Sequence, residues 1–516
     1  MYKSKKKDWF KIKRYPHIGF PLKYSDRIKW IESYILDKSK IASHSFLPFI
    51  HKTSKVRKFR KEYNSNDGQL IKSYNAEGEK TYRKSPLEPK KRELYYAGHL
   101  DSLIFSYYSH ILLDKYEEKI KEYRLDDVVT AYRSIPISKD KPLGPNKCNI
   151  DFANDTFNYI RKYNKEEFSA ITFDISGFFD NLDHNILLEK WVNILNQGSK
   201  LPDDHFNIFK NITRFSYVNI VDVFKVFQNR IYVQEIDRNG NLLSKKRKRV
   251  SRIKFLRKEN AIAFCTKKEF IKIKSRLIQN TKLESSSKIL RKKGIPQGSP
   301  ISSTLANLYL IDFDKKLNDE LTSINGIYRR YSDDMVVVCP HEHHKRIIDL
   351  IKTSINEVKL VIQDTKTQIF HFKRQNERLI CGQEFDNGIN WNKNFQYLGF
   401  DFNGEFTLLK SASMSGYYRK MKRTINRAKR YANNPNNKNH KEIFKRRILN
   451  KFSYKGAQRR RIWEWSDKVN GFVKTERYDW GNFLSYAKKA SSVMDKNNIN
   501  SQIKNHWKLI HKELSK

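Results

Sequence analysis

The order of hydrophobic and polar residues predicts a chain with both helices and strands. After Glu93, the segment "LDSLIFSYYSHILLDKYEEKIKEY" follows the helical period and predicts an amphipathic helix. Its apolar side carries Leu103, Tyr107, Tyr108, Ile111 and Leu112. Residues 1–92 hold Lys-rich and turn-forming stretches such as "YNSNDGQ", and their periodicity is weak. We therefore expect residues 1–92 to be a basic N-terminal extension and the folded body to follow it.

One hydrophobic run contains an acid. The run "AITFDI" predicts a strand that buries readily, yet Asp174 stands inside it, where an unpaired carboxylate is costly. The chain then turns at Ser176–Gly177 and continues into a predicted helix. The apolar face of that helix carries Leu187, Trp191, Ile194 and Leu195. A strand that delivers a carboxylate to a tight turn suits a metal ion and a phosphate, so we expect a cation near Asp174.

Two β-favouring runs flank a pair of adjacent acids. Residues 328–331 and 335–338 predict strands, and "SDD" between them predicts the tip of a hairpin. An ordinary surface turn is the alternative, because Asp is common in turns. However, Asp174, Asp333 and Asp334 on strand ends would repel one another unless divalent cations neutralise them, and oxygen ligands suit Mg²⁺. The pattern therefore predicts a site for two metal ions.

A glycine-containing turn precedes a predicted helix in "KKGIPQGSPISSTLANLYLIDFDKKL". Ser299 and Pro300 suit the first positions of that helix, and Gly298 permits close backbone approach. The apolar stripe of the helix carries Ile301, Leu305, Tyr309, Phe313 and Leu317. The exposed N-terminus can support an anion or a nucleotide, and Gln297 is placed to hydrogen-bond either. The alternative is a well-capped structural helix.

Composition narrows the class of protein. The 516 residues include 103 Lys and Arg but only 56 Asp and Glu, which gives a net charge of +47. Such an excess favours a nucleic-acid partner. Because 13% of the residues are aromatic, a disordered polycation is excluded, and the length excludes a peptide toxin or a lone binding module.

Cysteine and hydropathy patterns indicate few other features. The four cysteines are far apart, so neither a disulfide framework nor a zinc knuckle is expected. Cys339, His341, His343 and His344 suggest a metal cluster, but their spacing favours an exposed polar turn. Neither a secretory signal nor an apolar run of about 18 residues is evident, so we expect a cytoplasmic protein.

Two regions are notably basic. From Lys245 to Lys258 there are nine Lys or Arg residues before any acid, which predicts either a phosphate contact or a solvated loop. After residue 406 the pattern becomes helical and basic with interleaved Tyr and Trp, which suits a grip on a duplex or a strand. The candidate nucleic-acid contacts are Lys245, Lys246, Arg247, Lys248, Arg249, Arg423, Arg427, Arg446, Arg447, Arg459 and Arg460.

These motifs together resemble those of reverse transcriptases. "TFDISGFFDNLDH", "GIPQGSPISSTLANLYL" and "YSDD" have the order and approximate spacing of family motifs A, B and C. "LVIQDTKTQIF" is similar to motif D, and "FQYLGFDF" is similar to the primer grip with Tyr397, Leu398 and Gly399. "AYRSIPISKDKPLGPNKCNIDFAN" resembles the fingers motif of prokaryotic members, so the resemblance covers about residues 93–405. It points to retron-like, abortive-infection and other defence-associated bacterial enzymes.

The resemblance implies a fold: an α+β right-hand polymerase with fingers, an antiparallel palm sheet and a basic helical thumb. The implied segments are the extension at 1–92, fingers at 93–169, palm motif A at 170–195, a basic insertion at 196–290, palm motifs B to E at 291–405 and a thumb-like domain at 406–516.

The resemblance also implies roles. Asp174 and Asp333 would bridge two Mg²⁺ ions, Asp334 would complete the carboxylate set, and the Ile175 carbonyl would add a ligand. Lys366 would neutralise or protonate the leaving group, with a solvated Lys as the alternative. The weaker candidates for incoming-phosphate contacts are Arg133, Lys139 and Lys141.

The resemblance further implies a choice of sugar. Phe179 stands where the family places an aromatic ring that excludes a 2′-hydroxyl, which would select deoxynucleotides. The alternative is that Phe178 or Phe179 is only part of the core.

The sequence also departs from parts of the family. No "HNH" motif or RNase H carboxylate set follows the polymerase motifs, and the interval between motifs A and B is long. Both features favour the defence-associated branch, in which a dedicated noncoding RNA is often the template or scaffold. We expect an RNA-directed DNA polymerase of antiphage defence that uses an RNA template and dNTPs, makes DNA and has no membrane partner. Template-independent synthesis, protein-primed synthesis, a non-catalytic RNA-binding scaffold or splicing helper, and a homo-oligomer remain open.

Overall fold

The computed structural model describes residues 8–61, 71–74, 80–82, 84–138, 140, 144–196, 198–236, 242–281, 290–437, 441–458, 461–466, 471–478 and 481–515. The predictions for Lys139, Lys141, Arg459 and Arg460 concern residues outside these ranges. The chain divides into two compact units, which we describe separately. Unit 1 comprises residues 1–5, 121–176 and 311–516, and unit 2 comprises residues 6–120 and 177–310.

A mixed α/β architecture with antiparallel sheets characterises unit 1, as predicted at this coarse level. The described part of its main sheet has the strand order β12-β13-β6-β14-β15-β16, and all neighbours are antiparallel. These strands are β12 (Ile327–Tyr331), β13 (Asp334–Pro340), β6 (Glu167–Asp174), β14 (Gln368–Gln375), β15 (Arg378–Phe385) and β16 (Gly388–Asn390). The predicted strand before Asp174 and the predicted hairpin are confirmed as β6 and as β12–β13.

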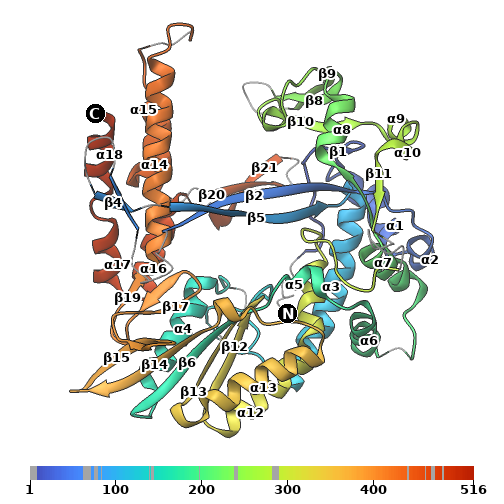
Figure 1. The fold of residues 1–516 in the computed structure, drawn as a ribbon. Coiled ribbons are helices and arrows are strands. Elements are labelled where there is room, and N and C mark those ends of the chain that lie inside the picture. Colours follow the sequence, from blue (N-terminus) through green and yellow to red (C-terminus); the bar gives the residue numbers. More distant parts are fainter. Residues whose placement is uncertain are drawn as a thin grey trace. The chain divides into compact units, whose positions relative to one another are not determined.

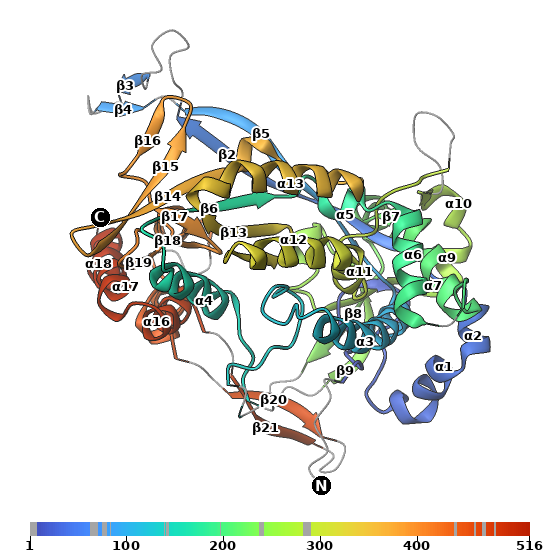
Figure 2. The same ribbon diagram turned by 90° about the horizontal axis from the view of Figure 1, so that it is seen from below.

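Each face of this sheet carries alternate residues of its strands. Phe168 and Ala170 of β6 belong to a buried cluster with Ile150 and Phe157 of α4 (Asn149–Lys162). In Figure 1, α12 (Ile311–Ser323) and α13 (His344–Glu357) run side by side along the sheet, and Figure 2 shows the pair from below. The short helices η3 (His341–His343) and η4 (Asp364–Lys366) flank β13 and β14 along the chain.

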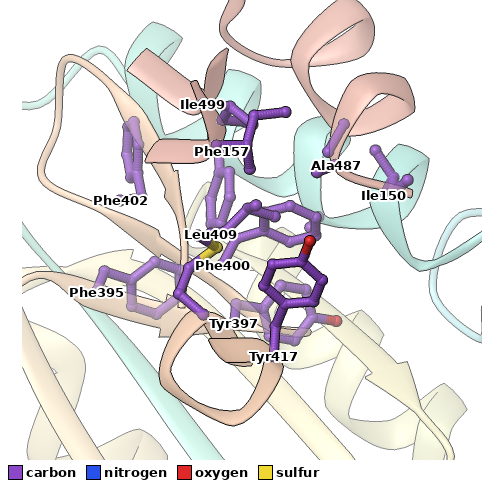
Figure 3. Packing of buried hydrophobic residues seen from close by; sticks show 14 of the residues in the cluster. Ile150, Phe157, Phe395, Tyr397, Phe400, Phe402, Leu409, Tyr417, Ala487 and Ile499 are labelled. Carbon is purple, nitrogen blue, oxygen red and sulfur yellow. The ribbon is translucent and has the colours of Figure 1, made fainter. Parts of the chain in front are cut away.

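The same buried cluster joins the sheet to a small second sheet and to the C-terminal helices (Figure 3). The second sheet comprises β17 (Phe395–Tyr397), β18 (Phe400–Phe402) and β19 (Thr407–Leu409). Phe402 stacks on Phe157 with ring centroids 4.8 Å apart. Ala487 and Ile499 reach the cluster from the C-terminal helices. Burial of large aromatic rings is worth several kcal/mol in such a core, so this cluster fixes β17 and β18 beside the main sheet.

The C-terminal part of unit 1 is largely helical. Its elements are α14 (Ser411–Ala432), α15 (Lys445–Phe452), η5 (Tyr454–Gly456), β20 (Arg461–Ser466), β21 (Gly471–Tyr478), α16 (Phe483–Val493), α17 (Lys496–Ile503) and α18 (His506–Ser515). One face of α14 buries Met414, Tyr417, Met421 and Ile425. This spacing of three or four residues is the helical period, so the cations of α14 lie on its other faces.

Unit 2 contains strands where the sequence predicted only an extension. Over its described residues, one sheet has the order β11-β7-β2-β5 and another β1-β10-β8-β9, while β3 pairs with β4. The strands are β1 (His17–Ile18), β2 (Phe49–Lys61), β3 (Lys72–Tyr74), β4 (Lys80–Tyr82), β5 (Lys84–Tyr96), β7 (Ser216–Asn219), β8 (Ile231–Ile236), β9 (Leu242–Lys248), β10 (Ala261–Cys265) and β11 (Ile278–Asn280). β2 and β5 form a long antiparallel ribbon (Figure 1). Its many Lys residues hide the strand pattern.

The helical elements of unit 2 are η1 (Arg27–Ile31), α1 (Glu32–Leu36), α2 (Lys38–Ala42), α3 (His99–Glu122, whose last two residues belong to unit 1), α5 (Phe178–Asn181), α6 (His184–Leu195), α7 (Asp203–Thr213), α8 (Ile220–Phe227), η2 (Ile253–Phe255), α9 (Lys267–Ile271), α10 (Lys274–Leu277) and α11 (Ser302–Tyr309). The predicted helix is confirmed as α3, which buries Leu103, Tyr108 and Leu112 of the predicted apolar side, while Tyr107 and Ile111 are half-buried. The predicted apolar face after motif A is confirmed in α6, which buries Leu187, Trp191, Ile194 and Leu195.

The predicted helix start at Ser299 is wrong. Helix α11 begins at Ser302, because the chain first turns through residues 298–301 and the Ser302 hydroxyl donates a hydrogen bond to the Pro296 carbonyl at 2.7 Å. A break at Leu310 separates α11 from α12. Among the helices that the structure describes, none combines the length and the hydropathy needed to span a membrane.

Candidate active site

Two of the predicted acids face each other across neighbouring strands of unit 1. Asp174 is the last residue of β6, Asp334 is the first residue of β13, and the two are directly paired in the antiparallel register. Directly opposed residues in such a ladder point to the same face of the sheet, with Cβ atoms about 5 Å apart. Residues 160 positions apart in the sequence, 174 and 334, therefore meet at one end of the sheet.

Asp333 lies in the two-residue turn that closes the β12–β13 hairpin. Tyr331 pairs with Asp334, so Ser332 and Asp333 form the tip. The backbone amide of Ile175 donates a hydrogen bond to the Asp333 carbonyl at 3.2 Å. This bond ties the tip to the end of β6, so the structure brings Asp174, Asp333 and Asp334 into one region.

Lys366 also reaches this region. It ends the short helix η4, and its ammonium donates to Asp174 Oδ1 at 2.7 Å. The residue predicted to act on a leaving group thus forms an ion pair with a predicted metal ligand. Its catalytic role stays a prediction.

The electrostatics of the region are dominated by crowded negative charge. The surrounding protein removes water from Asp334 and thereby raises its pKa to about 6, and the charges of Asp333 and Asp174 add to the rise. Lys366 and Lys410 act in the opposite direction. Asp334 keeps part of its surface accessible to solvent. An added cation would therefore be attracted to this site.

A pocket of about 510 Å³ opens over these residues. It is lined by Asn149, Thr172, Phe173, Asp174, Tyr331, Asp334, Met335, Lys366, Gln368, Gln396, Tyr397, Leu398, Gly399 and Lys410. The structure thus brings the predicted primer-grip residues to the same pocket as Asp174, Asp334 and Lys366.

The primer-grip residues form a second tight hairpin tip. Tyr397 pairs with Phe400, so Leu398 and Gly399 make the turn, with φ values of 44° and 95°. A left-handed φ is unfavourable for Leu, and Asn149 donates a hydrogen bond from its Nδ2 to the Leu398 carbonyl at 3.2 Å. Tertiary contacts therefore hold this turn in the pocket wall.

Sequence reasoning missed two residues of the pocket. Lys410 follows β19 directly and places a second cation near Asp334. Asn149 is the first residue of α4 and fastens the Leu398 turn. The strand ending "TLLK" gave a weak signal for Lys410, because a lone Lys after an apolar strand marks its exit from the core. Nothing in the local sequence pointed to Asn149.

Arg133 lies in unit 1, and its guanidinium contacts residues that shortly precede it in the chain. Its guanidinium donates to the carbonyls of Asp126 and Val129, each at 2.8 Å, and pairs with the Asp126 carboxylate at 3.5 Å. The Arg133 side chain is only 3% exposed. A contact with an incoming phosphate stays a prediction, and this geometry gives it no support.

The remaining nucleotide-site candidates belong to unit 2. In α5, Phe178 is buried, whereas Phe179 is partly exposed, so the two rings divide between core and surface. Gly298 has φ 113°, and a Cβ there would lie 2.7 Å from the Tyr95 carbonyl oxygen. The Gln297 carbonyl accepts a hydrogen bond from the Tyr95 amide at 2.8 Å. The close approach explains the glycine, while the nucleotide roles of Phe179, Gln297 and Gly298 stay predictions.

The first basic segment is a strand with paired cations. Lys245 to Lys248 lie on β9, followed by Arg249, and all five side chains are exposed. The ion pairs are Lys246–Glu235 at 2.9 Å, Arg247–Glu269 at 3.1 Å and Lys248–Glu259 at 2.6 Å. The loop alternative is therefore wrong for Lys245–Lys248, whereas residues 249–258 form turns and the short helix η2. The phosphate contacts of the segment stay a prediction.

The C-terminal candidates are exposed on helices. Arg423 and Arg427 lie on α14, and Arg446 and Arg447 lie on α15. Their exposure is compatible with binding a polyanion.

The side chains predicted to bind metal ions do not form a compact cluster in the part of the chain that the structure describes. Within the described ranges, no cluster of three or more His, Cys, Asp or Glu side chains is close enough to hold a metal ion. The metal interpretation of Cys339 and the following histidines is therefore unsupported. All four cysteines are free, three of them buried.

Comparisons with known proteins agree with several of the motifs. Residues 248–402 match a family model described as reverse transcriptase (RNA-dependent DNA polymerase). That range holds Asp333, Asp334, Lys366 and the Tyr397–Gly399 turn, whereas Asp174 precedes it. The retron Se72 reverse transcriptase of Salmonella heidelberg (strain 579083-10) is 30% identical over 89 residues, which are 16% of this chain and 24% of that protein. The match thus spans about a quarter of the relative.

Solved structures give weaker matches. Apo telomerase from Candida tropicalis matches with a TM-score of 0.35 and 12% identity over 79% of this chain and 57% of that one. Telomerase from Candida albicans, in complex with the TWJ fragment of telomeric RNA, matches with a TM-score of 0.35 and 13% identity over 95% of this chain and 68% of that one.

Proposed function

We propose, from the match of residues 248–402 to the reverse transcriptase family and the partial similarity to a retron enzyme, that this chain is an RNA-directed DNA polymerase that adds dNTPs to a 3′-hydroxyl with release of pyrophosphate. The proposal includes a right-hand polymerase fold, with the main sheet of unit 1 as palm and the basic C-terminal helices as thumb.

One observation carries the proposal. Asp174 and Asp334 face each other at the end of the sheet, and Asp333 stands in the adjoining hairpin turn. Asp174 and Asp334 line a pocket together with Lys366 and the Tyr397–Gly399 turn. Acids, a cation and a backbone platform in one pocket are the groups that phosphoryl transfer to a nucleic-acid end requires.

The donors fit Mg²⁺ in chemistry. Asp174, Asp333 and Asp334 would hold it, and the Ile175 carbonyl would add an oxygen ligand. Burial raises the pKa of Asp334, and the charges of Asp333 and Asp174 raise it further. A bound cation would relieve that repulsion, which supports this assignment. When bound, two Mg²⁺ ions activate the attacking hydroxyl and stabilise the leaving pyrophosphate.

The residues of the chain then have distinct tasks. Lys366, which donates to Asp174, would exchange this contact for one with the triphosphate. The Tyr397–Gly399 turn would support the primer end, and Phe179 would reject a 2′-hydroxyl. Exposed cations such as Arg423 and Arg427 would hold the backbone of the template and product.

We further propose an RNA template, a dedicated noncoding RNA as its source, and a role in bacterial antiphage defence. The retron relative and the resemblance of the motifs support these assignments.

Primer extension tests the proposed function. Purified protein with Mg²⁺, labelled dNTPs and a primed RNA is expected to extend the primer, whereas Asp333→Ala/Asp334→Ala should extend nothing and keep its circular dichroism spectrum. Asp349→Asn on α13 serves as the matched control. Extension by the folded double variant would refute the site assignment. Labelled product without RNA would indicate template-independent synthesis, and label that stays on denatured protein would indicate protein priming. No incorporation by the wild-type protein would favour a non-catalytic RNA-binding scaffold.

A further inference from the structure

A buried ion pair fastens the hairpin that carries Asp333. Arg330 of β12 donates from Nε to Asp314 Oδ1 at 2.8 Å and from Nη2 to Asp314 Oδ2 at 2.5 Å. Both side chains are completely buried. Such a bidentate pair fixes the plane of the guanidinium. Removing both charges from water costs free energy, so we expect the pair to have a role besides stability.

The third nitrogen of Arg330 indicates that role, because it contacts the hairpin tip. Arg330 Nη1 donates to the Ser332 carbonyl at 3.2 Å, which places the guanidinium between α12 and the hairpin tip. Tyr328 donates its hydroxyl to Asp314 Oδ1 at 2.9 Å and adds a further hydrogen bond to the pair. The network thus connects a helix side chain to the backbone of the turn.

Arg330 acts from the opposite face of the sheet to the carboxylates. Tyr328 and Arg330 are the buried positions of β12, while Tyr331 alternates to the other face and pairs with Asp334. Arg330 itself pairs with Met335. Since directly opposed residues share a face, the guanidinium and the Asp334 carboxylate lie on different sides, and Arg330 touches the tip through the Ser332 carbonyl.

The Ser332–Asp333 turn requires stabilising contacts. Ser332 has φ 62°, a left-handed conformation that costs free energy in a residue with a side chain. The hydroxyls of Ser332 and Tyr132 hydrogen-bond at 3.1 Å. The segment before Tyr132 runs beside β12: the Arg330 amide donates to the Val128 carbonyl at 2.8 Å, and the Thr130 amide donates to the Arg330 carbonyl at 3.0 Å. The strained tip is therefore held from two sides.

We propose that Arg330, oriented by Asp314, is a positioning residue that fixes the Ser332–Asp333 turn against the end of β6. The expected effect of Arg330 on kcat rests on the proposed function, whereas its expected effect on the order of the turn does not. The reporter of the structural consequence is the Ile175 amide, which donates to the Asp333 carbonyl.

The test removes both charges together, because a single buried charge left unpaired is strongly destabilising. In Asp314→Leu/Arg330→Met, we expect a first thermal transition within about 5 °C of the wild-type value. Hydrogen exchange of the peptide that contains Ile175 should be about tenfold faster, while peptides from the middle of β6 and β13 are unchanged. The kcat should fall about tenfold, with KM for dNTP within about threefold.

The matched control is Lys316→Gln/Glu357→Gln, which removes an exposed ion pair between the same helix α12 and α13. It should leave all three measurements unchanged. Unchanged exchange at Ile175 and unchanged kcat in the folded double variant would overturn the inference, as would faster exchange spread evenly over β6 and β13. If the double variant does not fold, Arg330→Lys decides by the same criteria, because an ammonium cannot reproduce the planar fork. Absence of wild-type activity would refute only the proposed function, and exchange would still decide this inference.

Discussion

The ammonium of Lys366 lies 2.7 Å from Oδ1 of Asp174, so the acid at the end of β6 already has a cationic partner. In the proposed reaction, Lys366 leaves this partner as substrate and metal arrive. On that proposal, the ion pair would limit repulsion among the acids before substrate binds, and Lys366 would remain close enough to contact the phosphates afterwards.

Replacement of Lys366 by Met is expected to slow nucleotide incorporation about a hundredfold, because a positioned proton donor or cation is lost. The pKa of Asp334 should rise further, since Lys366 lowers it. Rapid-quench incorporation measures the rate. Lys352→Met is the control, because Lys352 pairs with Asp364 of the same short helix, η4, at 2.9 Å. Equal rates for the wild-type protein and K366M would contradict the role.

The raised pKa of Asp334 predicts how stability depends on pH. Well below its ordinary pKa of 3.8, this carboxyl is neutral in the folded and the unfolded chain and costs nothing. As the pH rises from about 4 to about 6, the unfolded chain ionises this carboxyl while the folded chain still holds its proton, and stability is lost. Asp334→Asn should therefore raise the first melting temperature by about 1–3 °C near neutral pH and by almost nothing at a pH of about 3. The gain is small because Asp334 keeps contact with solvent.

Fluorimetric melting without divalent cations, in a series of buffers, measures this effect. Asp349→Asn, on α13, is the control. A gain that stays the same at all pH values would show that the substitution acts by packing rather than by charge.

The local sequence predicted the positions of the acids well. Hydrophobic runs that end in Asp174 or begin after Asp334 specify strands, and a two-residue tip fixes the register of the β12–β13 hairpin. The pairing of Asp174 with Asp334 joins β6 to β13, and this long-range contact does not follow from the local pattern. The predicted role of these acids came from the family resemblance.

Other parts could not be predicted because tertiary packing decides them. In the sequence, Asp314 is an ordinary acid within a predicted helix. In the structure it lies in the first turn of α12, and its pairing with Arg330 depends on how α12 lies against β12. Asn149 fastens a turn that lies far along the chain, at Leu398. The strand β2 could not be recognised from the sequence, because its many Lys residues weaken the alternation of hydrophobic and polar positions.

Gly298→Ala is expected to destabilise the protein by about 2 kcal/mol or more, because φ is 113° and a Cβ would lie 2.7 Å from the Tyr95 carbonyl oxygen. Gly416→Ala is the matched control: a Cβ there has no neighbour within 4 Å, and the residue lies in α14. It should stabilise the helix by about 0.5–1 kcal/mol. Urea unfolding of both variants measures the difference, and equal midpoints would contradict the close approach of the Gly298 turn to Tyr95.

The basic helix α14 is expected to contribute to nucleic-acid affinity through exposed, phosphate-binding cations. Arg423→Gln/Arg427→Gln should weaken binding of a primed RNA and reduce the slope of log K against log salt by about 2, since each phosphate contact releases about one counterion. Lys246→Gln/Arg247→Gln on β9 should change the slope less, because these side chains pair with Glu235 and Glu269 and must leave those acids to reach a phosphate. Fluorescence anisotropy across a salt series measures both slopes. If the β9 variant loses more slope than the α14 variant, the nucleic acid follows β9 instead of α14.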